Sequence, residues 1–167
     1  MEFNKFNKMM LQVIEYSGEC CDFLAFKLNR LEKLALSAKY LKDNGFDDDG
    51  GILMRKIKEE KEQIYELMAL LKRIQRAINK YFDAQANFEE VQRKALTVGL
   101  ERVSREFENA QKQFEEAQRS AIKIGAEFSI KFAEVKIKDE LNVVTNKHEE
   151  AELRKHLSDL KELKKNC

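Results

Sequence analysis

Residues 86–110 read ANFEEVQRKALTVGLERVSREFENA, and a single glycine, Gly99, lies near their centre. Within this stretch, an acidic residue precedes a basic one by four positions, as in Glu101 with Arg105, and this order stabilises helices. A thin apolar seam with charged flanks is typical of a two-helix coiled coil. After the glycine, the seam has heptad spacing and alternates bulky with small residues: Leu100, Val103, Phe107, Ala110, Phe114 and Ala117.

The apolar face widens on both sides of this seam, at nearly equal distances from the glycine. Residues 64–82 and 121–137 each carry a broad apolar arc, which a helix needs when it has more than one neighbour. Glycine suits the left-handed conformation that ends many helices. A chain reversal at residues 97–99 would therefore lay one broad arc against the other and seam against seam.

The rest of the chain supplies further helices. Apolar residues recur at helical spacing before residue 43, for example through Leu24, Leu28 and Leu31, and the chain contains no proline. We expect one all-α domain over residues 1–167: an elongated antiparallel three-helix bundle with a projecting two-helix coiled-coil hairpin and a short C-terminal helix. The expected elements are helix one at 1–43, an acidic and glycine-rich loop at 43–51, helix two at 52–98, helix three at 100–141 and a C-terminal helix at 146–165.

Two alternatives compete with parts of this fold. The apolar repeat keeps its phase through Gly99, so an unbroken helix could make the same pairings between two chains in a domain-swapped antiparallel dimer. Residues 122–132 alternate as a half-buried strand would. A helix is favoured there because it pairs Glu127 with Lys131 and because no second strand of similar quality is present.

Charge and cysteine content limit the function classes. Thirty-one basic and 30 acidic residues give a net charge of +1, which offers no basic excess for nucleic acid or anionic lipid. Cys20, Cys21 and Cys167 have no metal-binding or catalytic spacing, as expected in a reducing compartment. The sequence shows neither a secretory segment nor a spanning helix. We expect a cytoplasmic protein, although secretion by a signal-independent machine would leave the same pattern.

Motifs for catalysis or metal binding are missing from the sequence. The acidic run at residues 47–49 does not fit a calcium loop, because Lys56 stands where a bidentate glutamate is required. His148, Glu152 and His156 share one face of the last predicted helix, but a solvated flank explains them better than a metal site. We therefore expect no enzyme, no cofactor and no metal.

The function predicted from these patterns is a non-enzymatic helical interaction module, such as an adaptor, chaperone, inhibitor or assembly subunit. It would bind a protein partner or a second copy through coiled-coil surfaces. The alternative is a membrane-associated helical protein that engages lipid through residues 121–137 or through an elongated dimer, which is less favoured because the polar face there includes glutamates. The predicted partner-binding residues are Leu96, Val98, Leu100, Val103 and Phe107.

Overall fold

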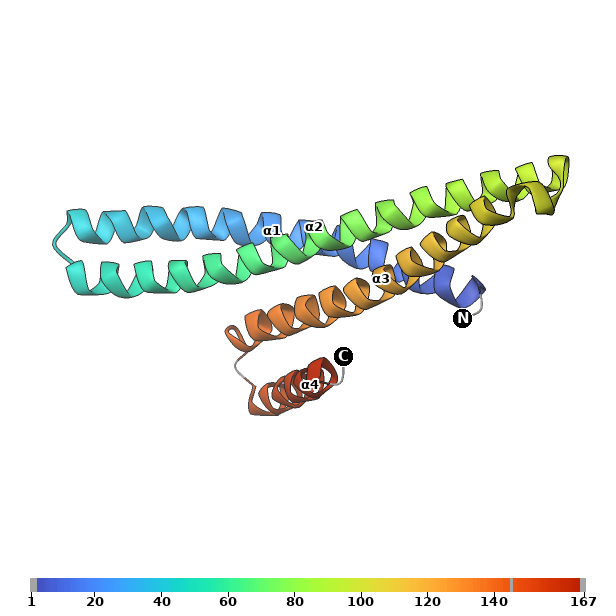
Figure 1. The fold of residues 1–167 in the computed structure, drawn as a ribbon. Helices are drawn as coiled ribbons and strands as arrows, with labels where there is room; N and C mark the ends of the chain where they lie inside the picture. The colour runs from blue at the N-terminus through green and yellow to red at the C-terminus, as the bar shows by residue number, and fades with distance from the viewer. Residues whose placement is uncertain (1–2, 145, 166–167) are drawn as a thin grey trace.

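A computed structural model of the chain describes residues 3–144 and 146–165, and every regular element within them is a helix. The all-α prediction is confirmed, and residues 122–132 are helical rather than a strand. None of the described helices is both long and apolar enough to span a bilayer. The elements are α1 (Phe3–Asp43), α2 (Asp47–Val98), α3 (Leu100–Leu141) and α4 (Lys147–Lys165), shown in Figure 1.

Helix α2 is the longest element and contacts both α1 and α3 (Figure 1). Helix α1 runs antiparallel to residues 47–81 of α2, with Lys27 near Glu60 and the Phe6 ring 4.7 Å from the Tyr81 ring. Helix α3 returns along α2 from the turn at Gly99 at least as far as Glu66, which lies 3.0 Å from Lys131. The core lies where the three helices overlap, and its largest fully buried side chains are Tyr81, Phe6, Phe128, Phe132, Leu67, Ile74 and Cys20.

The chain reverses direction at Gly99 instead of continuing as one helix. Its φ of 92° lies in a region that side chains other than glycine rarely adopt. The Gly99 N–H donates to the Ala95 carbonyl at 3.0 Å, and the Gly99 carbonyl accepts from the Arg102 N–H at 3.3 Å. The backbone groups at this turn are therefore used within a single chain.

Helix α2 begins at Asp47 rather than at residue 52, so the connection from α1 is only residues 44–46. Three aspartates occupy the first turn of α2, where negative charge is favourable beside the exposed amide groups. Gly50 lies inside this helix because the two helices approach closely there. A Cβ added to it would lie 2.8 Å from Lys42 Cγ.

Two ends of the molecule have only two helices each. The α2–α3 hairpin extends beyond α1 at one end, and the α1–α2 turn extends beyond α3 at the other (Figure 1). The second extension was not predicted. It arises because α3 ends shortly after Asp139, which contacts Lys27, so the last turns of α1 have α2 as their neighbour.

Helix α4 contacts α3 and lies beside its C-terminal half (Figure 1). Asn146 caps its first turn, because the side-chain Oδ1 accepts a hydrogen bond from the His148 N–H at 2.9 Å. Leu153, Leu157 and Leu160 are half-buried along one face of the helix.

Candidate functional site

The hairpin that extends beyond α1 has a packed interior. The Phe88 ring of α2 lies 5.4 Å from the Phe107 ring and 5.6 Å from the Phe114 ring of α3, and it stacks on the latter at 14°. Such aromatic contacts add to the burial of apolar area. Buried aliphatic residues complete the seam: Val91, Val103 and Ala110.

The five residues predicted to bind a partner fall into two groups. Leu96, Val98 and Leu100 surround the turn and are 88%, 40% and 55% exposed. Val103 is buried in the seam, and Phe107 is half-buried against Phe88. The first group is available to a partner in this conformation, whereas the second holds the two helices together. The heptad spacing in the sequence already indicates that Val103 and Phe107 lie between the two helices.

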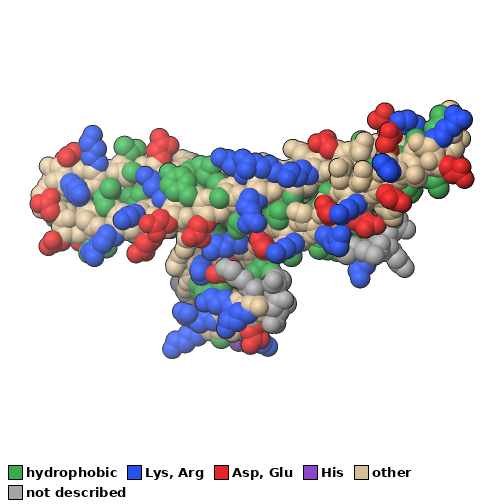
Figure 2. All heavy atoms as spheres, viewed as in Figure 1, with side chains coloured by type: hydrophobic (Ala, Val, Ile, Leu, Met, Phe, Trp, Pro, Cys, Tyr) green, Lys and Arg blue, Asp and Glu red, His purple; other side chains and the backbone are tan. Residues whose placement is uncertain are grey.

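Polar groups surround these three aliphatic side chains. Lys94 on α2 and Glu106 on α3 form an ion pair with a distance of 2.8 Å between Nζ and Oε2. Within the described residues, the exposed side chains of Arg102 and Arg105 make no ion pair or hydrogen bond. Figure 2 shows hydrophobic, basic and acidic side chains together at this end of the molecule. We define residues 91–107 as the hairpin tip.

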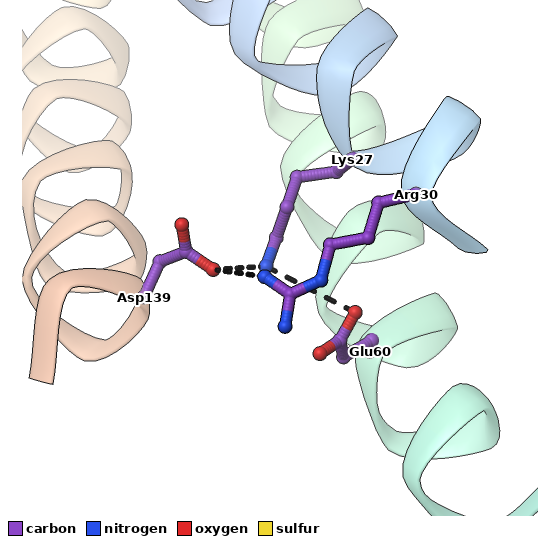
Figure 3. Close-up of polar contacts among 4 residues, drawn as sticks. All are labelled: Lys27, Arg30, Glu60 and Asp139. Atoms are coloured by element: carbon purple, nitrogen blue, oxygen red, sulfur yellow. Dashed lines mark hydrogen bonds and ion pairs between the residues drawn. The ribbon is translucent and has the colours of Figure 1, made fainter. Parts of the chain in front are cut away.

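A second cluster, which the sequence analysis did not identify, joins α1, α2 and α3 (Figure 3). Lys27 is only 3% exposed; its Nζ contacts Asp139 Oδ1 and lies 3.9 Å from Glu60 Oε2. Arg30 approaches Asp139 Oδ1 at 3.7 Å. The sequence signal that could have identified Lys27 is its helical spacing, which places it on the buried side of α1 near Leu24. We call these four charged residues the ion-pair cluster.

A cleft of about 440 Å³ opens beside the ion-pair cluster, and residues from all four helices line it. Its charged groups have both signs, with Lys56 and Glu59 on α2, Lys138 on α3 and Arg154 on α4. Lys138 is bound to Glu134, and Arg154 is bound to a neighbouring glutamate of its own helix. Lys138 and Arg154 are therefore held within their own helices, and among the described lining residues no side chain is paired as nucleophile and base.

Residues 3–144 and 146–165 contain no cluster with metal-binding geometry. No group of three or more His, Cys, Asp or Glu side chains there could hold an ion. His148 Nε2 lies 3.5 Å from Glu152 Oε1, but both side chains are largely exposed, and His156 is exposed as well. This pair is therefore a solvated helix flank.

The apolar arc at residues 121–137 is used inside the protein. Ala121, Phe128, Phe132 and Val135 on this arc are buried in the core. In this conformation they contact other helices rather than forming a free lipid-facing surface.

The two adjacent cysteines differ in environment. Cys20 is buried, and burial raises the pKa of its thiol to about 12, with a smaller contribution from Cys21. Cys21 is exposed, and Cys167 lies outside the described residues.

In a Cys167→Ser background, we expect Cys21 to react with a thiol reagent at least about a hundredfold faster than Cys20, because the thiolate is the reactive form. Stopped-flow labelling measures both rates, and a further Cys21→Ser change should remove the fast phase. Equal rates in the native protein would contradict this assignment.

Comparison with protein-family models, with curated proteins and with solved structures finds no match to this chain. Its function is therefore argued from its own geometry.

Proposed function

We propose that this chain is a non-enzymatic, cytoplasmic interaction module in which an antiparallel three-helix bundle carries a coiled-coil hairpin whose tip binds a protein partner. The observation that carries the proposal is the exposure of Leu96, Val98 and Leu100 at the tip. Large apolar side chains that gather on a surface often mark interaction sites. Here they lie at the end of a hairpin whose interior is packed. They are therefore not exposed because the hairpin lacks a core.

The packing of the two helices beneath the hairpin tip favours binding. The side chains of Phe88, Phe107 and Phe114 contact one another across the hairpin, so that the turn is held by packed helices. A surface that is already ordered loses less conformational entropy when it binds. Arg102 and Arg105 beside the apolar residues would give a preference for a partner with an acidic rim.

Photo-crosslinking from the tip tests this proposal. A photoreactive amino acid at position 96 or 100 should give a discrete protein adduct in cells that express the full chain. The matched control is position 36, because Leu36 is 65% exposed at the opposite end of the molecule. Adducts of equal yield at positions 36, 96 and 100, or none at the tip, would refute the assignment. Adducts with lipid alone would favour the membrane-associated alternative.

A further inference from the structure

The surface area of the chain is large for its mass. It exposes 11930 Å² at 19.6 kDa. The scaling for compact monomers predicts about 8,600 Å² for this mass, so the excess is about 3,300 Å². Extensive protein interfaces bury roughly 2,000–5,000 Å² in total over both partners. The elongated chain therefore has enough additional surface to form such an interface.

A large part of the exposed apolar surface lies on α1. Four residues on this helix form a hole of mostly small side chains, and all four are exposed: Gly18, Cys21, Asp22 and Ala25. Their spacing of i, i+3, i+4 and i+7 is that of a hole that accepts one knob in helix packing. Large apolar residues that are 41–62% exposed lie before and after the hole: Leu11, Ile14, Phe26 and Leu28. We call these eight residues the outer α1 face.

The charge of this part of α1 is opposite to that of the hairpin tip. Residues 9–26 contain no Lys or Arg but include Glu15, Glu19 and Asp22. None of these three carboxylates makes an ion pair or hydrogen bond within the part of the chain that the structure describes. The tip at residues 91–107 contains four basic and two acidic residues, a net charge of 4 − 2 = +2. Complementary potentials of this kind favour encounter and select among partners.

We propose that the hairpin tip docks on the outer α1 face of a second copy of this chain. Leu96 or Leu100 enters the hole, and Arg102 and Arg105 face the carboxylates of Glu15 and Asp22. The proposal rests on the proposed function of the tip and names its partner. It brings together the exposed apolar residues of the tip and of the outer α1 face, and it pairs charges that have no partner among the described residues of one molecule.

The two surfaces cannot meet within a single molecule. Because Phe6 lies beside Tyr81 and Lys27 near Glu60, the hole lies alongside approximately residues 62–69 of α2. About 30 residues of helix separate that position from Gly99, a distance of about 45 Å at 1.5 Å per residue. Two antiparallel copies related by a twofold axis would each place a tip on the other's α1, which makes a closed dimer.

Charge reversal on the full chain tests this arrangement. Sedimentation equilibrium of the wild type at low salt should give twice the monomer mass of 19.6 kDa at micromolar concentrations. R102E with R105E should weaken dimerisation at least about tenfold, and so should E15R with D22R, because each leaves like charges facing each other. The four changes together should restore most of the affinity. R76E is the matched control, since Arg76 is exposed and lies outside both surfaces.

The outcomes separate this inference from the proposed function. A wild-type chain that stays monomeric at all concentrations would overturn docking between copies, while a protein adduct from the tip would still support the proposed function. A dimer that is insensitive to both charge reversals would also overturn the inference. An open-ended series of oligomers would overturn the closed twofold arrangement. Circular dichroism checks that each variant is folded.

Discussion

Replacement of Tyr81 by alanine is expected to lower the free energy of unfolding by about 3–5 kcal/mol, the range found when a large buried aromatic side chain is truncated. Tyr81 is 1% exposed. Its ring lies 4.7 Å from the ring of Phe6, 5.4 Å from that of Phe82 and 5.5 Å from that of Phe114. One side chain therefore links α1, α2 and α3. Urea unfolding followed by circular dichroism measures the loss.

Tyr81→Phe is the matched control, and we expect it to be neutral or to stabilise the protein by about 1 kcal/mol. The Tyr81 hydroxyl is buried and has no hydrogen-bond partner among residues 3–144 and 146–165. Removing an unpaired buried polar group keeps the ring contacts and removes a desolvation cost. A loss above about 1 kcal/mol in this variant would show that the hydroxyl has a partner and would contradict the assignment.

Tyr81 also predicts how the stability of the folded protein depends on pH. Burial, and to a lesser extent the nearby Glu89, raise the pKa of Tyr81 above its ordinary value of 10.0. The unfolded chain then loses this proton at lower pH than the folded protein, so the stability contributed by the neutral phenol is complete below pH 10 and is lost as the pH rises further. The Tyr81→Phe variant should therefore resist alkaline unfolding better than the wild type.

Several local sequence signals agree at the α2–α3 hairpin. The heptad spacing, the flanking charge pairs and Gly99 all indicate two helices and a turn, and α3 spans Leu100–Leu141, in agreement with the predicted range of 100–141. The start of α2 was predicted too late because aspartate and glycine favour loops locally. In the folded protein, the aspartates lie at the N-terminus of α2, where their negative charge is favourable. Gly50 allows the close approach of Lys42, which depends on how α1 and α2 pack together.

Which side of α1 is buried could not be read from periodicity. Apolar residues surround much of this helix, and Leu24 is buried whereas Leu28, on the same predicted stripe, is 47% exposed. A broad apolar arc does not specify how many neighbours cover it. The answer depends on where α3 ends and on how the helices cross, which are tertiary properties.

The tip and the ion-pair cluster illustrate the same limit for the candidate sites. The sequence located the tip, but only the folded hairpin separates the exposed Leu96 from the buried Val103. Lys27 has helical spacing with buried residues, yet a lysine at such a position is usually assigned to the surface. Its carboxylate partners, Glu60 and Asp139, are distant in sequence and could not be paired with it from periodicity alone.

Lys27→Met is expected to destabilise the protein by about 3–5 kcal/mol, because it leaves the buried Glu60 without its cation and leaves Asp139 with only Arg30, 3.7 Å away. The side chains of Lys27 and Glu60 are 4% and 10% exposed, and that of Asp139 is 20% exposed. The loss should be largest at the end of α3, where Asp139 bonds to α1. Hydrogen exchange at residues 130–144 would locate it, and urea unfolding would measure its size.

A variant that removes Lys27 and both carboxylates, and keeps only the more exposed Arg30, separates pairing from packing. Lys27→Met combined with Glu60→Leu and Asp139→Leu should be more stable than Lys27→Met alone, because no uncompensated charge then remains buried. The exposed pair of Arg73 and Glu127, with N and O atoms 3.4 Å apart, supplies the control. Arg73→Ala should cost less than about 1 kcal/mol, as expected for a solvated ion pair. If Lys27→Met cost no more than Arg73→Ala, water would have to reach the carboxylates through the adjoining cleft, and the cluster would not anchor α3 to α1.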